Sequence, residues 1–121
     1  LMPGVLEGIR ELLASGVEID ILTARGHYPG EIDSVVHVLA KHSLDLRIIG
    51  TAYQPKSGFL DRHVVMLDDQ LHEFEGMSES VHCLLFSGPH NKQAQQDLRG
   101  GITLIHDWPH AVEKIKKLLV R

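Results

Sequence analysis

The sequence predicts an α/β fold, a Rossmann-like parallel sheet with helices on both faces. Short runs of Val, Ile and Leu alternate with longer segments in which apolar residues recur at helical spacing. Continuous apolar runs are typical of parallel strands that are buried on both faces, and the intervening helices are typical of crossover connections. The chain has 121 residues, of which 43% are hydrophobic, and it contains no linker or internal repeat. We therefore expect one domain over residues 1–121.

The first half of the chain predicts two helix–strand pairs. Apolar residues at helical spacing indicate a helix over residues 3–15, with Gly16 suited to its C-terminal cap. A β-branched apolar block over residues 17–22 predicts a strand. A second helical pattern covers residues 30–42, and residues 46–50 predict the next strand. A helix thus crosses between two strands.

The second half predicts three more strands and a closing helix. Apolar runs at residues 63–67, 81–86 and 102–105 each end at polar or turn-forming residues, as strands do. The last helix is expected over residues 108–119. Because sheets of this class bind ligands beyond the carboxyl ends of their strands, the polar residues at those ends are the candidates for function.

Charge and composition exclude some classes of partner. The net charge is −4 with both signs mixed along the chain, so no footprint for a nucleic-acid polymer is present. No apolar stretch approaches the roughly 20 residues that a membrane span needs, and no signal peptide opens the chain. The single cysteine, Cys83, lies in an apolar run and predicts a buried thiol in a reducing, cytoplasmic setting.

The strongest candidate for chemistry is the pair Asp68 and Asp69, which directly follows an apolar strand. Two adjacent carboxylates repel each other unless a cation or a shared proton intervenes. Magnesium prefers oxygen ligands and commonly binds through one or two carboxylates together with substrate phosphate. The simpler alternative is that the pair caps a helix beginning near residues 70–72, where acidic groups are favourable.

Two other loops offer groups that bind phosphate. The hydroxyl of Thr23, the amides of the Thr23–Ala24–Arg25 loop and the guanidinium of Arg25 could hold phosphate oxygens, although such a loop often only shapes a turn. Lys56 lies twelve residues before Asp68 and could neutralise phosphate charge, although lysines in loops are usually just solvated. His90 and Asn91, at another strand end, are weaker candidates for substrate contact.

Other chemistries lack their motifs. The nine histidines show no zinc-finger spacing with cysteine, and the chain has one cysteine. Neither a serine nucleophile elbow nor a glycine-rich phosphate loop occurs. Acyl transfer and nucleotide-kinase chemistry are therefore disfavoured.

The ordered set of motifs is more specific than any one of them. Ile21-Leu22-Thr23-Ala24-Arg25, then Lys56, then Val64-Val65-Met66-Leu67-Asp68-Asp69 resembles motifs two, three and four of the haloacid dehalogenase superfamily. The later runs, residues 81–91 and 105–108, are similar to the ends of deoxyribonucleotidase-like members. The resemblance spans nearly the whole chain.

This resemblance implies a magnesium-dependent phosphatase that acts on a phosphorylated small molecule such as a nucleotide. Thr23 would bind the transferring phosphate, Lys56 would stabilise the aspartyl-phosphate site, and Asp68 would ligate Mg²⁺ with help from Asp69. The family's first motif, an Asp-x-Asp that supplies the nucleophile, is absent from these residues. The strand that carries it lies at the centre of the family's sheet, between the strands that end here at Thr23 and Asp68.

The missing motif leaves several interpretations open. The chain could be an N-terminally incomplete phosphatase, inactive alone, or a part that another chain or a second copy completes, or a rearranged domain. A different class of function is a non-catalytic α/β binding or interaction domain. A response-regulator receiver uses similar residue types but fails on order, because its acidic pair comes first and its lysine last.

Overall fold

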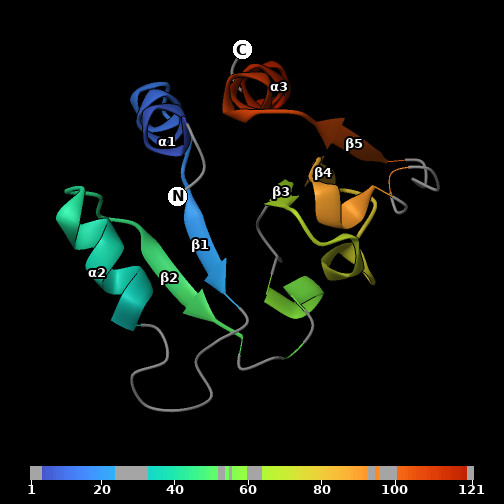
Figure 1. The fold of residues 1–121 in the computed structure, drawn as a ribbon, viewed down its shortest axis with the longest axis horizontal. Coiled ribbons are helices and arrows are strands. Elements are labelled where there is room, and N and C mark those ends of the chain that lie inside the picture. Colours follow the sequence, from blue (N-terminus) through green and yellow to red (C-terminus); the bar gives the residue numbers. More distant parts are fainter. Residues whose placement is uncertain are drawn as a thin grey trace.

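The computed structural model confirms the α/β class, with parallel strands and helices alternating along the chain (Figure 1). The first half holds α1 (Val5–Ala14), β1 (Asp20–Thr23), α2 (Asp33–Lys41) and β2 (Arg47–Gly50). The second half holds η1 (Lys56–Phe59), β3 (Val65–Asp68), η2 (Leu71–Phe74), β4 (His82–Phe86), η3 (Pro89–Asn91), β5 (Ile102–Ile105) and α3 (Trp108–Leu119). The structure describes residues 4–23, 33–51, 54, 56–59, 64–92, 95 and 101–119. No helix among these residues has the length and apolar composition to cross a membrane.

The strands form two parallel sheets, whereas the sequence predicted a single one. β1 pairs with β2, from Asp20 opposite Arg47 to Thr23 opposite Gly50. β4 lies between β3 and β5 in a second sheet of three strands. Figure 1 shows β1 and β2 on one side of the molecule and the three-stranded sheet on the other. Among the described residues, no ladder of hydrogen bonds joins β1 to β3.

The end of α1 explains why β1 begins later than expected. Gly16 has a φ of 84°, the left-handed conformation that glycine adopts without a steric penalty. The amide of Gly16 donates to the carbonyl of Leu13 and that of Val17 to the carbonyl of Leu12, a Schellman cap. Because the cap uses the amide of Val17, sheet pairing starts only at Asp20.

The core forms on both faces of the three-stranded sheet because successive strand side chains point to opposite faces. On one face Leu84, Phe86 and Ile105 pack against α1 and α3. On the other face Cys83 and Leu85 pack in a cluster with Met66, Val81 and, from η2, Phe74. Leu85 and Ile105 are each 0% exposed, so β4 and β5 lie at the centre of the core.

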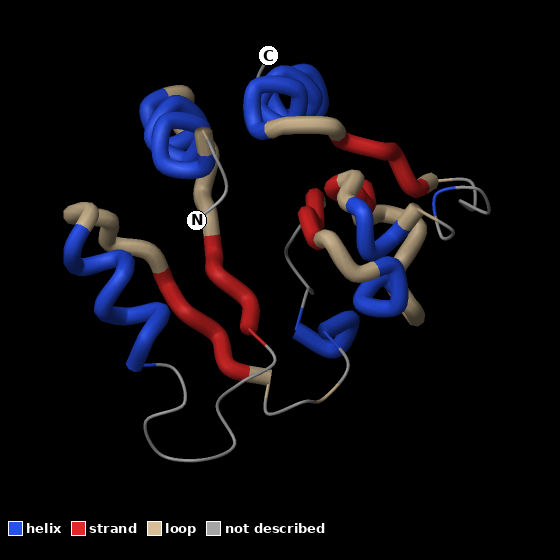
Figure 2. The backbone as a smooth tube through the Cα atoms, viewed as in Figure 1, coloured by secondary structure: helices blue, strands red, loops and turns tan. Residues whose placement is uncertain are grey.

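A close contact between α1 and α3 links the two halves of the chain. Figure 2 shows these two helices side by side above the strands. The contact passes over Gly8, where a Cβ atom would lie 3.0 Å from Trp108 Cε3 and 3.2 Å from Val112 Cγ2. Trp108 also packs on Phe86, with ring centroids 5.2 Å apart. Glycine at position 8 therefore permits the approach that joins α1 to the main core.

Candidate functional site

The candidate site is a lysine–carboxylate pair at the carboxyl end of β3. Lys56 Nζ lies 2.9 Å from Asp68 Oδ2, and each side chain is only 11% exposed. The first turn of η1 carries Lys56, and β3 places Asp68 at its last residue. A pair removed this far from water interacts more strongly than a surface pair and is less screened by salt. The interpretation of Lys56 as a solvated loop lysine is therefore wrong.

Glu73 is a second carboxylate near the same lysine, and sequence reasoning missed it. Its Oε2 lies 3.8 Å from Lys56 Nζ, and its side chain is 20% exposed. The contact arises because η2 turns the chain back toward η1 directly after Asp68. Lys56 thus lies between two carboxylates. No motif in the sequence marks Glu73, since a glutamate in a short polar turn is ordinarily a surface residue.

Asp68 also bonds the backbone that directly follows it, although η2 itself begins after Gln70 without a side-chain cap. Its Oδ1 accepts hydrogen bonds from the backbone amides of Asp69, at 2.8 Å, and Gln70, at 3.1 Å. The segment that follows is the 3₁₀ turn η2. One carboxylate therefore shapes the turn with one oxygen and pairs with Lys56 through the other. The side chain of Asp69 is exposed at the same strand end.

Asn91 fastens the loop after β3 to the loop after β4. Its Nδ2 donates to the carbonyl of Phe86 at 2.7 Å and to that of Asp69 at 3.0 Å. Its Oδ1 accepts from the amide of Gly88 at 2.9 Å and from Gln95 Nε2 at 2.6 Å. The residue is only 6% exposed, so its amide is satisfied by the protein itself. In this structure Asn91 positions the segment of Asp69 and Gln70 that follows β3, which we call the acidic loop.

The structure brings together only part of the predicted site. Thr23 ends β1 in the two-stranded sheet, opposite Gly50, whereas Asp68 ends β3 in the other sheet. The side chain of Thr23 lies outside the described part of the structure, and so do Ala24 and Arg25. His90 belongs to η3, but its side chain is likewise outside that part. The phosphate-binding roles expected of these residues stay predictions.

Polar side chains also gather where β4 and β5 end. The amide of Ser87 donates to the carbonyl of Ile105, and Ser87 Oγ lies 3.5 Å from His106 Nδ1. The rings of His106 and His110 stack with centroids 5.5 Å apart. The sequence analysis did not predict this pair of histidines, because residues at the end of a strand and in the first turn of a helix show no regular spacing.

The donor atoms at the site suit magnesium in kind, but the protein supplies few of them. Among the described residues, no group of three or more His, Cys, Asp or Glu side chains is arranged to hold a metal. Asp68 and Asp69 offer adjacent carboxylates, and a carboxylate oxygen accepts more than one partner. Magnesium commonly takes its other ligands from water and substrate phosphate. The residues therefore fit a magnesium site that a phosphorylated ligand completes.

Comparison of the chain with protein-family models, with curated proteins and with solved structures found no match. A function for this chain must therefore be inferred from the side chains at the carboxyl ends of its strands. The central feature of these strand ends is the partly buried pair of Lys56 and Asp68, two residues twelve positions apart whose side chains are in direct contact.

Proposed function

We propose that the chain carries the magnesium- and phosphate-binding part of a phosphate monoester hydrolase of the haloacid dehalogenase type, with nucleotidase-like substrates. The contact between Lys56 and Asp68 is the observation that carries the proposal. A cation and a carboxylate held together at a strand end form a site that can neutralise a phosphoryl group and position its oxygens. The resemblance of the ordered motifs supplies the reaction class.

Lys56 is suited to bind the phosphate. An ammonium group has three donors, and Asp68 accepts only one at 2.9 Å, so others remain to reach a phosphoryl oxygen. Glu73, at 3.8 Å, adds a second negative charge beside the ammonium group of Lys56. Lys56 would thus bring positive charge to the phosphoryl oxygens without a large rearrangement of its side chain.

Asp68 and Asp69 would hold Mg²⁺, with the substrate phosphate and water as the other ligands. When bound, the metal would offset charge on the phosphoryl oxygens. Asp68 is fixed for this role by the two amides that bond its Oδ1, and Asn91 holds the backbone of Asp69 through its carbonyl. The acidic loop is therefore held in place before any ligand arrives.

The division of the sheet supports the resemblance at the level of the fold. Strand order in the two sheets is β2 and β1 in one, and β3, β4 and β5 in the other. In the family, the strand that carries the nucleophile lies between the equivalents of β1 and β3. We propose that the chain is a haloacid dehalogenase-like core that lacks this central strand. Catalysis would then require an aspartate from outside these 121 residues.

A non-catalytic binding domain is the second candidate, and one observation favours it. Asp68 accepts hydrogen bonds from the backbone amides of Asp69 and Gln70, a structural role that needs no metal. In that case the pair of Lys56 and Asp68 would stabilise the fold, and the loops would bind at most an anion.

Magnesium titration of the chain is the first experiment. Asp68→Asn should weaken magnesium binding at least about tenfold, because a charged ligand is lost. Glu79→Gln, which removes an exposed acidic residue away from the site, is the matched control and should leave the affinity unchanged. Equal affinity in the Asp68→Asn variant and the unaltered chain would refute the metal assignment.

Phosphate release from nucleoside monophosphates tests the reaction. The chain alone should release no phosphate. A version extended upstream along its natural reading frame should release phosphate if that extension carries a strand ending in Asp-x-Asp. Asp68→Asn in the extended version should abolish the activity. An extended version that has such a strand, folds and stays silent would leave the non-catalytic domain as the better account.

A further inference from the structure

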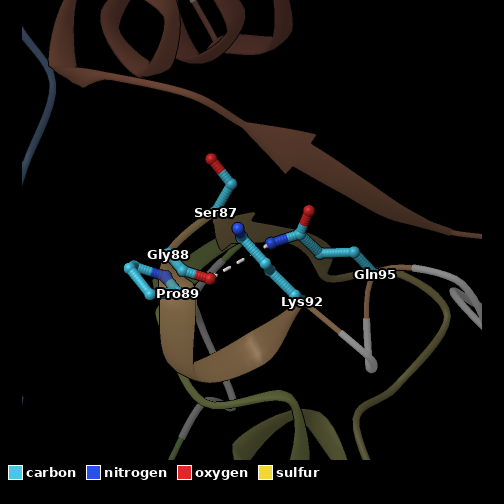
Figure 3. A pocket seen from close by; sticks show the side chains of 5 residues that line it. All are labelled: Ser87, Gly88, Pro89, Lys92 and Gln95. Carbon is cyan, nitrogen blue, oxygen red and sulfur yellow. Dashed lines mark hydrogen bonds between the residues drawn. The ribbon is translucent and has the colours of Figure 1, made fainter.

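A separate hollow lies next to the acidic loop, beyond the carboxyl end of β4. Five of the described residues line it, namely Ser87, Gly88, Pro89, Lys92 and Gln95, and its volume is about 260 Å³ (Figure 3). That space would admit a group much larger than one water molecule. Lys56, Asp68 and Asp69, the described residues proposed to bind magnesium or the transferred phosphate, do not line the hollow.

The charge of the hollow is positive. Lys92 is the one charged residue among the five, and no acidic side chain of a described residue lines the space. Among the residues that the structure describes, no carboxylate lies within ion-pair distance of Lys92, whereas Lys56, Lys116 and Lys117 all have one. In Figure 3 the amine of Lys92 points toward the side chains of Ser87 and Gln95. A negative ligand would therefore find an ammonium group without a competing carboxylate.

Ser87 adds a hydroxyl donor at the rim. Its backbone is fixed by the bond from its amide to the carbonyl of Ile105, at 2.8 Å. Within the part of the chain that the structure describes, its Oγ has one contact, at 3.5 Å with His106 Nδ1, which is long for a hydrogen bond. The hydroxyl can therefore rotate to donate to a ligand at little loss. An ammonium and a hydroxyl on one side of a hollow are typical donors for an oxyanion.

The floor of the hollow is rigid because Asn91 and Gln95 hold it. Gln95 Nε2 donates to Asn91 Oδ1 at 2.6 Å and to the carbonyl of Gly88 at 3.4 Å. The amide of Gly88 donates to the same Oδ1. These bonds fix the backbone between Ser87 and Lys92, so the donors are positioned before a ligand binds, which lowers the entropy lost on binding.

We propose that this hollow binds a phosphate-type oxyanion of a small molecule, with Lys92 and Ser87 as its donors. Phosphate is favoured over a carboxylate because it carries more charge and more acceptor oxygens. The inference does not rest on the proposed hydrolase function, since neither Asp68 nor magnesium takes part. A phosphatase substrate with a second phosphate, or a separate phosphorylated effector, would use the same chemistry.

Titration of the chain with inorganic phosphate, followed by amide NMR without magnesium, tests the proposal. Saturable shifts should map to residues 87, 88, 92 and 95. Lys92→Gln should weaken binding about tenfold or more, and Ser87→Ala should weaken it less, because a charged donor contributes more than a neutral one. Lys92 is exposed, so the substitution should leave the fold intact.

Matched controls separate this site from the others. Lys117→Gln removes an exposed lysine on α3 and should not change the affinity for phosphate. Acetate should bind more weakly than phosphate. Unsaturable shifts, shifts reproduced by sodium chloride at the same ionic strength, or an unchanged affinity in Lys92→Gln would each overturn the proposal.

Discussion

The two sheets have the same parallel pairing but differ in how far their side chains are removed from water. In the three-stranded sheet, Leu84 and Leu85 are 1% and 0% exposed, and packed clusters cover both faces. In β1 and β2, every described side chain is at least partly exposed. The ladder of β1 and β2 is regular over four residue pairs. Regular hydrogen bonding therefore does not by itself make a buried sheet.

The difference shows which part of the chain supplies its stability. Burial of apolar side chains dominates folding, whereas backbone hydrogen bonds largely replace bonds to water. We therefore expect the three-stranded sheet with α1 and α3 to be the stable unit, and β1, β2 and α2 to open at lower free energy. The following experiments test this contrast, from the largest expected effect to the smallest.

Truncation of a central leucine should have the largest effect. Leu85→Ala should lower the free energy of unfolding by about 3 kcal/mol, because it leaves a cavity in a fully buried site. Ile21→Ala in β1, where the side chain is half-buried, should lower it by about 1 kcal/mol. Urea denaturation followed by circular dichroism measures both. Equal losses would show that the two sheets share one core.

A larger side chain in place of Gly8 should push α1 and α3 apart. Gly8→Leu should destabilise the chain by about 2 kcal/mol, because Trp108 and Val112 already lie within 3.2 Å of the position of a Cβ. Ala14→Leu, on the exposed side of the same helix, is the control and should be nearly neutral. Thermal unfolding compares the variants. Equal midpoints for the two would mean that α1 and α3 tolerate a wider separation.

Replacing Ser43, just after α2, with glycine should stabilise the region formed by β1, α2 and β2. Ser43 has a φ of 55°, and the bond from the amide of Leu44 to the carbonyl of Leu39 completes a Schellman cap there. Ser43→Gly should relieve about 1 kcal/mol of backbone strain, partly offset by the freedom of glycine in the unfolded chain. Hydrogen exchange should slow in α2 and β2 and stay constant in β4. Slower exchange throughout would indicate one cooperative unit, and Ser43→Ala should give no gain.

The smallest expected effect concerns pH and Cys83 in β4. Burial raises the pKa of the Cys83 thiol, because the charged thiolate is desolvated. Folding therefore favours the protonated thiol, and this stability is present below the unfolded pKa of about 8.5 and lost as pH rises above it. The urea midpoint should fall between pH 8 and pH 10, less so in Cys83→Ala. Identical pH profiles would contradict this assignment.

The sequence was sufficient to predict most of the elements. All five strands and the three α-helices lie where apolar periodicity predicted them, because both patterns reflect which side chains face the core. The observed ends of the elements differ from the predicted ends by a few residues. The backbone amide of Val17, for example, caps α1, whereas the apolar pattern placed this residue in a strand. The apolar pattern did not predict the division into two sheets, because pairing between strands depends on contacts distant in sequence; the resemblance alone placed a missing strand between β1 and β3.

The candidate site was predicted in part. The order of motifs singled out Lys56 and Asp68 as parts of one site, and the structure shows that their side chains are in contact. Glu73 and the linking role of Asn91 were missed, since both depend on how short turns fold back on the strand ends. A glutamate or an asparagine in a polar loop has the same local sequence whether it faces water or joins two loops.

The hydrogen bonds of Asn91 also bear on how the protein ages. Spontaneous hydrolysis of the side-chain amide would turn Asn91 into aspartate, which accepts hydrogen bonds but has no donor when ionised. Its oxygens would then face the carbonyls of Phe86 and Asp69, with which Nδ2 now bonds. One such event would release the acidic loop from the end of β4.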